Sequence, residues 1–217
     1  LSREAWTSKD TRFLTLSLII GIFLDATGVA LLARSDFGIS AVSSVAYTLS
    51  RLFPTLTFGV WSYLYQFALF VLMCVLVRKC TVSYVCSFLI GVIFGYTLDF
   101  CSYFVNMLPF LFGVRLTCFV AGTVILIVGV SFLMISNMPI MPQDLFTREI
   151  HQYFGFPFKR VKITFDLSCV AISLVLALVV EKRVIGIGAG TIVNALIVGK
   201  CVDRVKKFLV DKILAFT

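Results

Sequence analysis

The chain has 217 residues, of which 60% are hydrophobic and only 14% are charged, and its mean hydropathy is +1.04. Water-soluble domains carry about 45–50% apolar and about 25% charged residues, and they do not expose apolar patches as large as this composition would require. The composition therefore excludes an ordinary soluble enzyme, a disordered chain and a secreted disulfide scaffold. It predicts an all-α polytopic membrane protein, with residues 1–217 in a single transmembrane domain.

The charge balance and the metal-binding residue types exclude further classes. There are 19 Lys and Arg residues against 11 Asp and Glu, a formal charge of +8, but no nucleic-acid-binding motif accompanies them. Basic residues of a membrane protein lie at helix ends and in cytoplasmic loops, so membrane lipids rather than nucleic acid are the expected contacts. The seven cysteines form no CxxC pair and His151 is the single histidine, so we expect no metal and no cofactor.

Six apolar runs are long enough to cross a bilayer core of about 30 Å, which takes about 20 helical residues. They cover residues 13–33, 58–77, 82–108, 116–135, 163–180 and 185–202, and a basic tail follows over 203–217. Two shorter segments, 38–53 and 139–154, are too short or too polar to be lipid-exposed spans. We expect each of them to be a short interfacial or re-entrant helix.

Orientation follows from the basic residues, which are enriched on the cytoplasmic side of membrane proteins. Six spans with both termini in the cytoplasm leave only five of these residues outside: Arg34, Arg51, Arg115, Lys182 and Arg183. The sequence therefore predicts a multi-pass protein of the bacterial cytoplasmic (inner) membrane with cytoplasmic N- and C-termini.

The two halves of the chain resemble each other. GVALLARSDFGI (28–39) matches GVSFLMISNMPI (129–140) at a shift of 101, and SFLIGVIFGYTLD (87–99) lies on TIVNALIVGKCVD (191–203) at a shift of 104. We predict repeat 1 over about 12–108 and repeat 2 over about 114–207. Three spans per repeat make the repeat inverted, as in many transporters; if the short segments also cross, the repeat is parallel.

Two stretches, LLARSDFGISAVSS and GIGAGTIVNALIVGKCVD, resemble the bacterial YczE/YyaS/YitT group of small integral membrane proteins over roughly residues 12–207. The second contains a Gly-x-Gly-Thr-x-x-Asn-Ala pattern at 188–195. The group often has a Pro-Trp-Asp-like stretch after the first break, which is Ile-Ser-Ala-Val-Ser here at 39–43. In the second repeat, residues 141–144 read Met-Pro-Gln-Asp, which is closer to that stretch. If the family uses an acid there, only Asp144 supplies it in this chain. The resemblance implies a small helical membrane protein and brings no established activity.

Asp25 is the most informative polar residue, because it lies in the middle of the first apolar run. Carboxylates inside a membrane usually face a cavity, a partner or an ion path, so we predict that Asp25 binds substrate and couples an ion. Gln66, Gln143, Asp144 and Asn194 are further candidates for substrate binding. The structural alternatives are a protonated Asp25 inside the bundle, a Lys162–Asp166 ion pair within one helix, and Asp144 capping its helix or pairing with Arg148.

Function is less constrained than architecture. No catalytic motif is present, so the protein is expected not to be an enzyme. We predict a small inner-membrane transporter of an unidentified small solute, bound near the midplane between the repeats. One alternative is a substrate-binding subunit of the S-component type, docking a partner through Ala26-x-x-x-Ala30. Another is a non-transporting accessory or scaffold protein. A homo-oligomer or a partner subunit fits each of these.

Overall fold

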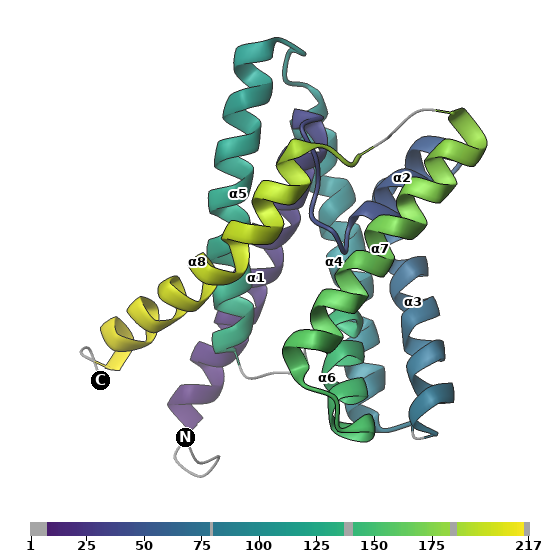
Figure 1. The fold of residues 1–217 in the computed structure, drawn as a ribbon. Helices are drawn as coiled ribbons and strands as arrows, with labels where there is room; N and C mark the ends of the chain where they lie inside the picture. Colours follow the sequence, from purple (N-terminus) through teal and green to yellow (C-terminus); the bar gives the residue numbers. More distant parts are fainter. Residues whose placement is uncertain (1–7, 79, 137–140, 183–185, 215–217) are drawn as a thin grey trace.

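The structure is a computed structural model that describes residues 8–78, 80–136, 141–182 and 186–214 (Figure 1). Within these ranges every regular element is a helix. In chain order the helices are α1 (Ser8–Ser35), α2 (Ser44–Leu52), α3 (Phe58–Val77), α4 (Val82–Asn106), α5 (Phe112–Ile135), α6 (Pro142–Phe154), α7 (Phe158–Glu181) and α8 (Ala189–Leu214). The short helices α2 and α6 correspond to the two segments that the sequence predicted to be shorter than a span.

Five of the described helices are long and apolar enough to cross a membrane, which is consistent with a multi-pass membrane protein. They are Phe13–Ser35, Phe58–Val77, Val82–Asn106, Phe112–Ile135 and Phe158–Glu181. α8, predicted as a sixth span followed by a tail, is one continuous helix whose second half is basic, and it is not among the five. α7 begins at Phe158 instead of 163, so Lys162 lies inside the helix.

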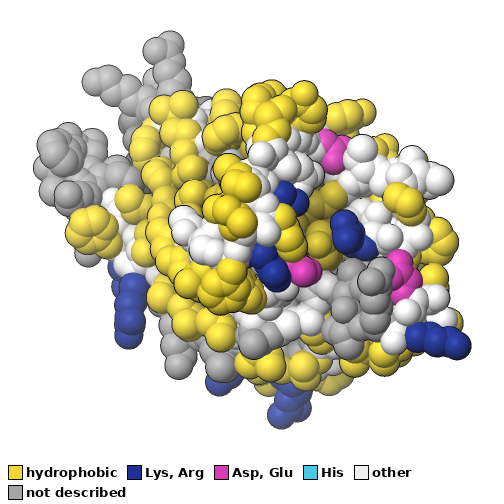
Figure 2. Space-filling view, turned by 90° about the horizontal axis from the view of Figure 1, so that it is seen from above, with side chains coloured by type: hydrophobic (Ala, Val, Ile, Leu, Met, Phe, Trp, Pro, Cys, Tyr) yellow, Lys and Arg dark blue, Asp and Glu magenta, His cyan; other side chains and the backbone are white. Residues whose placement is uncertain are grey.

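The outer surface of the long helices is apolar. Val75, Leu167 and Val179 are 66%, 64% and 74% exposed, and many similar side chains line the same outer faces. Figure 2 looks onto the end that carries the α4–α5 connection and shows some charged side chains near the middle of this face and others at its edge, with hydrophobic side chains over much of the surface. Since an apolar surface of this extent is unfavourable in water, it suits contact with lipid.

The helices form two groups (Figure 1). α4, α1, α5 and α8 pack side by side in that order, as a row. α2, α3, α6 and α7 form a closed ring in which α2 contacts α3 and α7, and α6 contacts the same two helices. α4 joins the row to the ring through contacts with α3 and α6. The two short helices therefore lie inside the protein, between long helices.

Glycines set the crossing of α1 and α5, which run antiparallel. An added Cβ at Gly28 would lie 2.7 Å from the backbone nitrogen of Leu126, and one at Gly129 would lie 2.5 Å from that of Asp25. The two backbones are therefore in direct contact. Ala26 and Ala30 are 0% and 2% exposed, so the expectation that they form a docking face for a partner is wrong: packing within the chain already covers them.

The end of α1 is joined to the start of α8 by the backbone. Gly38 has φ +134°, a conformation that suits glycine, and an added Cβ there would lie 2.5 Å from Thr191 N. Ile39 N donates to Gly186 O at 3.1 Å, and Gly190 N donates to Phe37 O at 2.9 Å. The glycine run at 186–190 thus serves close packing, and the N–H groups of Ile39 and Gly190 are already used in backbone hydrogen bonds.

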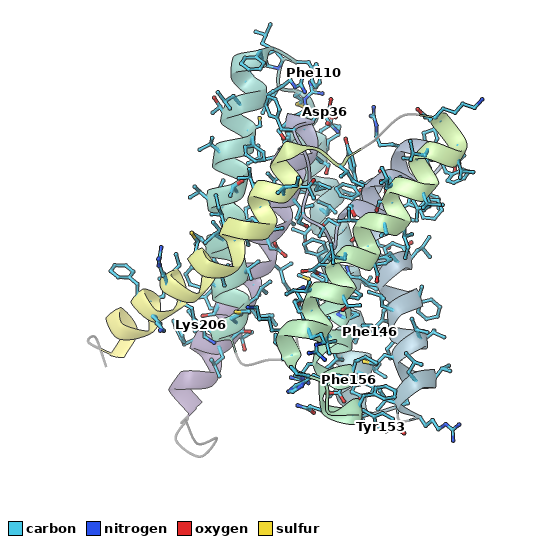
Figure 3. The ribbon with its side chains drawn as sticks, viewed as in Figure 1. Asp36, Phe110, Phe146, Tyr153, Phe156 and Lys206 are labelled. Carbon is cyan, nitrogen blue, oxygen red and sulfur yellow. The ribbon has the colours of Figure 1, made fainter. Side chains whose placement is uncertain are left out.

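A charged and aromatic cluster closes the same end of the molecule, where Figure 3 labels Asp36 and Phe110. Arg115 Nε donates to Ser35 O at 2.9 Å, and its guanidinium lies 3.4 Å from Asp36 Oδ2 and 4.6 Å from the centre of the Phe110 ring. Arg34 also lies over Phe110, at 5.0 Å. These contacts tie the start of α5 to the end of α1.

Candidate functional site

α6 starts with the residues that the sequence singled out, and it is embedded in the protein. Pro142 occupies its first turn and Met141 caps it without a side-chain hydrogen bond. Met141, Leu145 and Thr147 are 3%, 1% and 1% exposed, and the helix packs against α3, α4 and α7. The prediction that residues 139–154 are embedded in the protein holds for the first half of α6, whereas Tyr153 and Phe154 at its end are 50% and 46% exposed; residues 139–140 lie outside the described residues.

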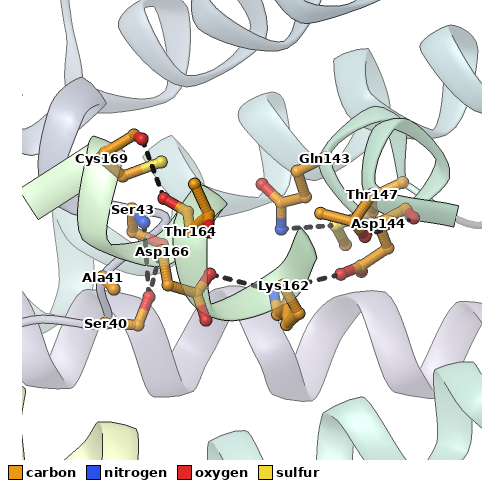
Figure 4. A network of polar contacts seen from close by, with 12 residues as sticks. Ser40, Ala41, Ser43, Gln143, Asp144, Thr147, Lys162, Thr164, Asp166 and Cys169 are labelled. Carbon is orange, nitrogen blue, oxygen red and sulfur yellow. Dashed lines mark hydrogen bonds and ion pairs between the residues drawn. The ribbon is translucent and has the colours of Figure 1, made fainter. Parts of the chain in front are cut away.

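Lys162 connects α6 to α7 through two carboxylates (Figure 4). Its Nζ lies 3.1 Å from Asp166 Oδ1 on the same helix and 3.8 Å from Asp144 Oδ1 on α6. The predicted Lys162–Asp166 pair is thus confirmed. Asp144 neither caps α6 nor pairs with Arg148, which lies 3.5 Å from Glu149 instead. Both alternatives for Asp144 are wrong because a cation from the neighbouring helix takes that position.

Aromatic side chains line the apolar side of this ion-pair group. Lys162 Nζ lies 5.8 Å from the centre of the Phe165 ring, and the Phe165 and Phe146 rings are 5.4 Å apart. Phe146, labelled in Figure 3, comes from α6 and Phe165 comes from α7. The ammonium group is therefore held by carboxylates and faces an aromatic ring, an arrangement that favours cations.

Asp25 lies in α1 and is 6% exposed, and its side chain forms no hydrogen bond or ion pair with any residue that the structure describes. A buried carboxylate without a partner is costly, so the burial of Asp25 calls for a cation or a proton.

Gln66 lies near the first turn of α6. It is 0% exposed; its Nε2 donates to Ser62 Oγ at 3.4 Å, and its Oε1 has no hydrogen-bond partner in the described part of the chain. An added Cβ at Gly91 would lie 2.4 Å from this Oε1 and 3.3 Å from Pro142 Cδ. The glycine of α4 thus makes room for the amide next to the start of α6.

Gln143 is half-buried in the first turn of α6, and its amide nitrogen lies 3.8 Å from Met141 Sδ, a weak contact. In Figure 4 it lies beside Lys162. It precedes Asp144 in the first turn of α6.

Asn194 is 2% exposed and belongs to a different contact. Its Oδ1 accepts a hydrogen bond from Thr123 Oγ1 at 3.0 Å, which joins α8 to α5, and its Nδ2 has no partner among the described residues. The structure gives Asn194 no polar contact with Asp25, Gln143 or Asp144 in the residues it describes. The contacts place Gln66 near Pro142, in the helical turn that holds Gln143 and Asp144, whereas no contact among the described residues joins Asp25 or Asn194 to that turn.

Sequence reasoning missed the central role of Lys162, which it treated only as a flanking basic residue and a partner for Asp166. The sequence feature that could have revealed it is the position of Lys162 within the apolar helix that begins at Phe158. Asp99, which lies inside the third apolar run, has a structural role. Its carboxylate accepts hydrogen bonds from Gly59 N at 2.7 Å and Thr57 Oγ1 at 2.5 Å, and so caps the start of α3.

No group of three or more His, Cys, Asp or Glu side chains that might hold a metal occurs in the residues that the structure describes. Fold and site together define a helical protein of the multi-pass membrane type, with a partly exposed ion-pair group at the start of a short helix. The family of unknown function DUF6198 matches residues 12–207, and the chain belongs to this family. No curated protein and no solved structure shows significant similarity to this chain.

Proposed function

We propose that the protein is a small-solute transporter of a bacterial inner membrane, related to the YczE/YyaS/YitT group, whose solute binds at the first turn of α6. Asp25 carries this proposal: it is 6% exposed, lies in an apolar helix and has no partner in the described chain. A purely structural protein gains nothing from burying such a group, whereas ionisable residues in membrane spans usually serve substrate or ion paths.

We further propose that the two halves form an inverted repeat. The contacts between α1 and α5 support this, because the shift of 101 exchanges them: Gly28 meets Leu126, and Gly129 meets Asp25. The same shift exchanges the contact of Gly21 with Leu133 and that of Gly122 with Leu32. Since the two helices are antiparallel, the implied two-fold axis is perpendicular to them and lies in the membrane plane, as in inverted-repeat transporters.

In this proposal α8 is the sixth crossing element and both termini are cytoplasmic. The start of α1 and the end of α8 lie at the same end of the molecule (Figure 1), and the basic second half of α8 lies there too. The positive-inside rule favours the cytoplasm for this end. Solute then enters between the row and the ring of helices, next to α6.

Transport by the purified full chain tests the proposal. Proteoliposomes would be incubated with a mixture of metabolites of all charge types, and the accumulated solutes identified by mass spectrometry. We expect a solute to accumulate with the wild type, and Asp25→Asn to reduce its uptake at least about tenfold. Asp36→Asn is the control, because Asp36 is exposed at the far end and pairs only at the surface. If no solute accumulates above protein-free liposomes, or both variants transport equally, the proposal is wrong.

A further inference from the structure

We infer that the start of α7 binds an anionic phospholipid. Lys159 and Arg160 hold the phosphate of its head group, and a groove between them and Thr164 takes the first part of an acyl chain. This inference depends on the membrane location of the chain and does not depend on the proposed transport function.

The groove lies on the exposed face of the first two turns of α7. Its volume is about 360 Å³, and it is lined by Pro157, Lys159, Arg160, Ile163 and Thr164. Ile163 is 49% exposed, and Leu167, one turn further along the helix, is 64% exposed. Apolar side chains therefore continue from the groove along the outer face of α7, which is the surface that an acyl chain covers in a bilayer.

The two cations at this groove have no carboxylate partner. Lys159 and Arg160 are exposed, and neither forms an ion pair with any residue that the structure describes. On the same helix and on α6, Asp166 and Asp144 pair with Lys162 instead. A phosphate group supplies the missing negative charge, and a guanidinium binds it through two parallel N–H donors. Since a zwitterionic head group carries its own cation, the pair favours an anionic lipid.

Aromatic rings next to the groove mark the depth of the lipid head groups. Tyr153, Phe154, Phe156 and Phe158 are each between 46% and 52% exposed, and the centres of the Phe154 and Phe156 rings lie 6.2 Å apart. Figure 3 labels Tyr153 and Phe156 at the end of the molecule where α1 begins and α8 ends. Exposed aromatic side chains gather at the boundary between head groups and acyl chains, so the cations beside them lie at the level of the phosphates.

The turn that carries these groups is fixed by its backbone. Gly155 has φ +72°, a conformation that suits glycine, and its N–H donates to His151 O at 3.0 Å. Two residues later Pro157 begins the next helix, because its carbonyl accepts from Arg160 N at 2.9 Å. The site is therefore largely formed before lipid binds, which lowers the entropy cost of binding.

The test follows the thermal unfolding midpoint of the purified full chain in a non-ionic detergent as dioleoylphosphatidylglycerol is added. Dioleoylphosphatidylcholine is the zwitterionic comparison. Glycerol 1-phosphate and inorganic phosphate present the same anion without acyl chains. We expect a saturable rise with phosphatidylglycerol and at least about tenfold weaker responses to the other three probes, because only this lipid offers both the charge and the chain.

The double variant Lys159→Gln, Arg160→Gln places the lipid at this groove. A basic residue near a membrane surface contributes about fivefold in affinity for anionic lipid, so we expect the apparent Kd to rise at least about tenfold. The matched control is Arg51→Gln, Arg78→Gln, which removes two charges from exposed arginines that have no ion-pair partner among the described residues. We expect it to change the apparent Kd by less than about twofold.

Equal losses in the two double variants would show attraction to the overall charge of the chain, and would overturn the inference. So would equal responses to phosphatidylglycerol and phosphatidylcholine, or binding of glycerol 1-phosphate or inorganic phosphate as tight as that of the lipid. Should the Lys159→Gln, Arg160→Gln chain be less stable without lipid, the single variants decide through the ratio of the two lipid affinities, which does not depend on the unliganded stability. Because no step of this test requires uptake, a failure of transport in proteoliposomes leaves the lipid site intact, and loss of the lipid site leaves transport intact.

Discussion

The α3–α4 pair and the α7–α8 pair hold corresponding places in the helix order, but only the first pair packs together. Gly59 and Gly95 bring the backbones of α3 and α4 into contact, and Asp99 of α4 caps the start of α3. α7 and α8 make no comparable contact in the described part of the chain, and α8 packs on α5 instead (Figure 1). The same order of helices therefore does not impose the same packing.

In the proposed repeat, a single residue accounts for much of this difference, because the shift of 101 carries Gly59 to Arg160 at the start of α7. A position that holds a long charged side chain cannot make the backbone contact of Gly59, where even a Cβ would lie 2.0 Å from Gly95 O. α7 is thus free to pack on α2 and α6, and to present Lys162 and Asp166 to the site.

The largest expected effect comes from Gly59→Ala, which breaks the α3–α4 contact. The added methyl group would overlap Gly95 O and crowd Asp99, so α3 must move away from α4. We expect a loss of about 2–3 kcal/mol in the free energy of unfolding, read as a lower thermal unfolding midpoint in detergent. Gly113→Ala is the matched control, because nothing lies within 4 Å of its Cβ; equal effects of the two would refute the packing argument.

The sequence predicts the parts of the fold that depend on local features better than the contacts between helices. The apolar run at 58–77 predicted α3 with its observed bounds, and Gly38 and Pro142 marked the breaks before the short helices. These are local features, set by composition and by backbone conformation. The sequence did not predict that Lys162 bridges to Asp144, because that pair joins two helices and follows no periodicity along the chain. For the same reason Asn194 was placed with Asp25 and not with Thr123.

The next effect in size is that of Asp99→Ala, which removes the cap of α3 and leaves the packed glycines in place. Gly59 N and the Thr57 hydroxyl lose their acceptor. We expect a cost of about 1–2 kcal/mol, measured as above. Asp36→Asn removes the charge of a carboxylate that is 55% exposed and suits the left-handed backbone there (φ +57°), so it should cost less than about 1 kcal/mol. A neutral Asp99→Ala would mean that the cap contributes nothing to the difference between the two pairs.

A smaller effect is expected where α8 packs on α5 instead of on α7. Thr123→Ala leaves the buried amide of Asn194 without its partner, at a cost of about 1 kcal/mol. The double variant Thr123→Ala, Asn194→Leu removes the unpaired amide as well, and we expect it to regain part of that stability. If the double variant is less stable than either single one, the Thr123–Asn194 contact is not what holds α8 to α5.

The smallest effect is predicted for Arg160→Ala, the counterpart of Gly59→Ala. Arg160 is exposed in the first turn of α7, and alanine is at least as good a helix former as arginine. The unfolding free energy should therefore change by no more than about 0.5 kcal/mol, because surface substitutions away from specific contacts rarely do more. The two variants are compared in the same measurement. A costly Gly59→Ala and a neutral Arg160→Ala are expected only if α3 needs a backbone contact at this position and α7 does not. A loss above about 1 kcal/mol for Arg160→Ala would show that this side chain holds α7 in place, and the freedom of α7 from α8 would then need another cause.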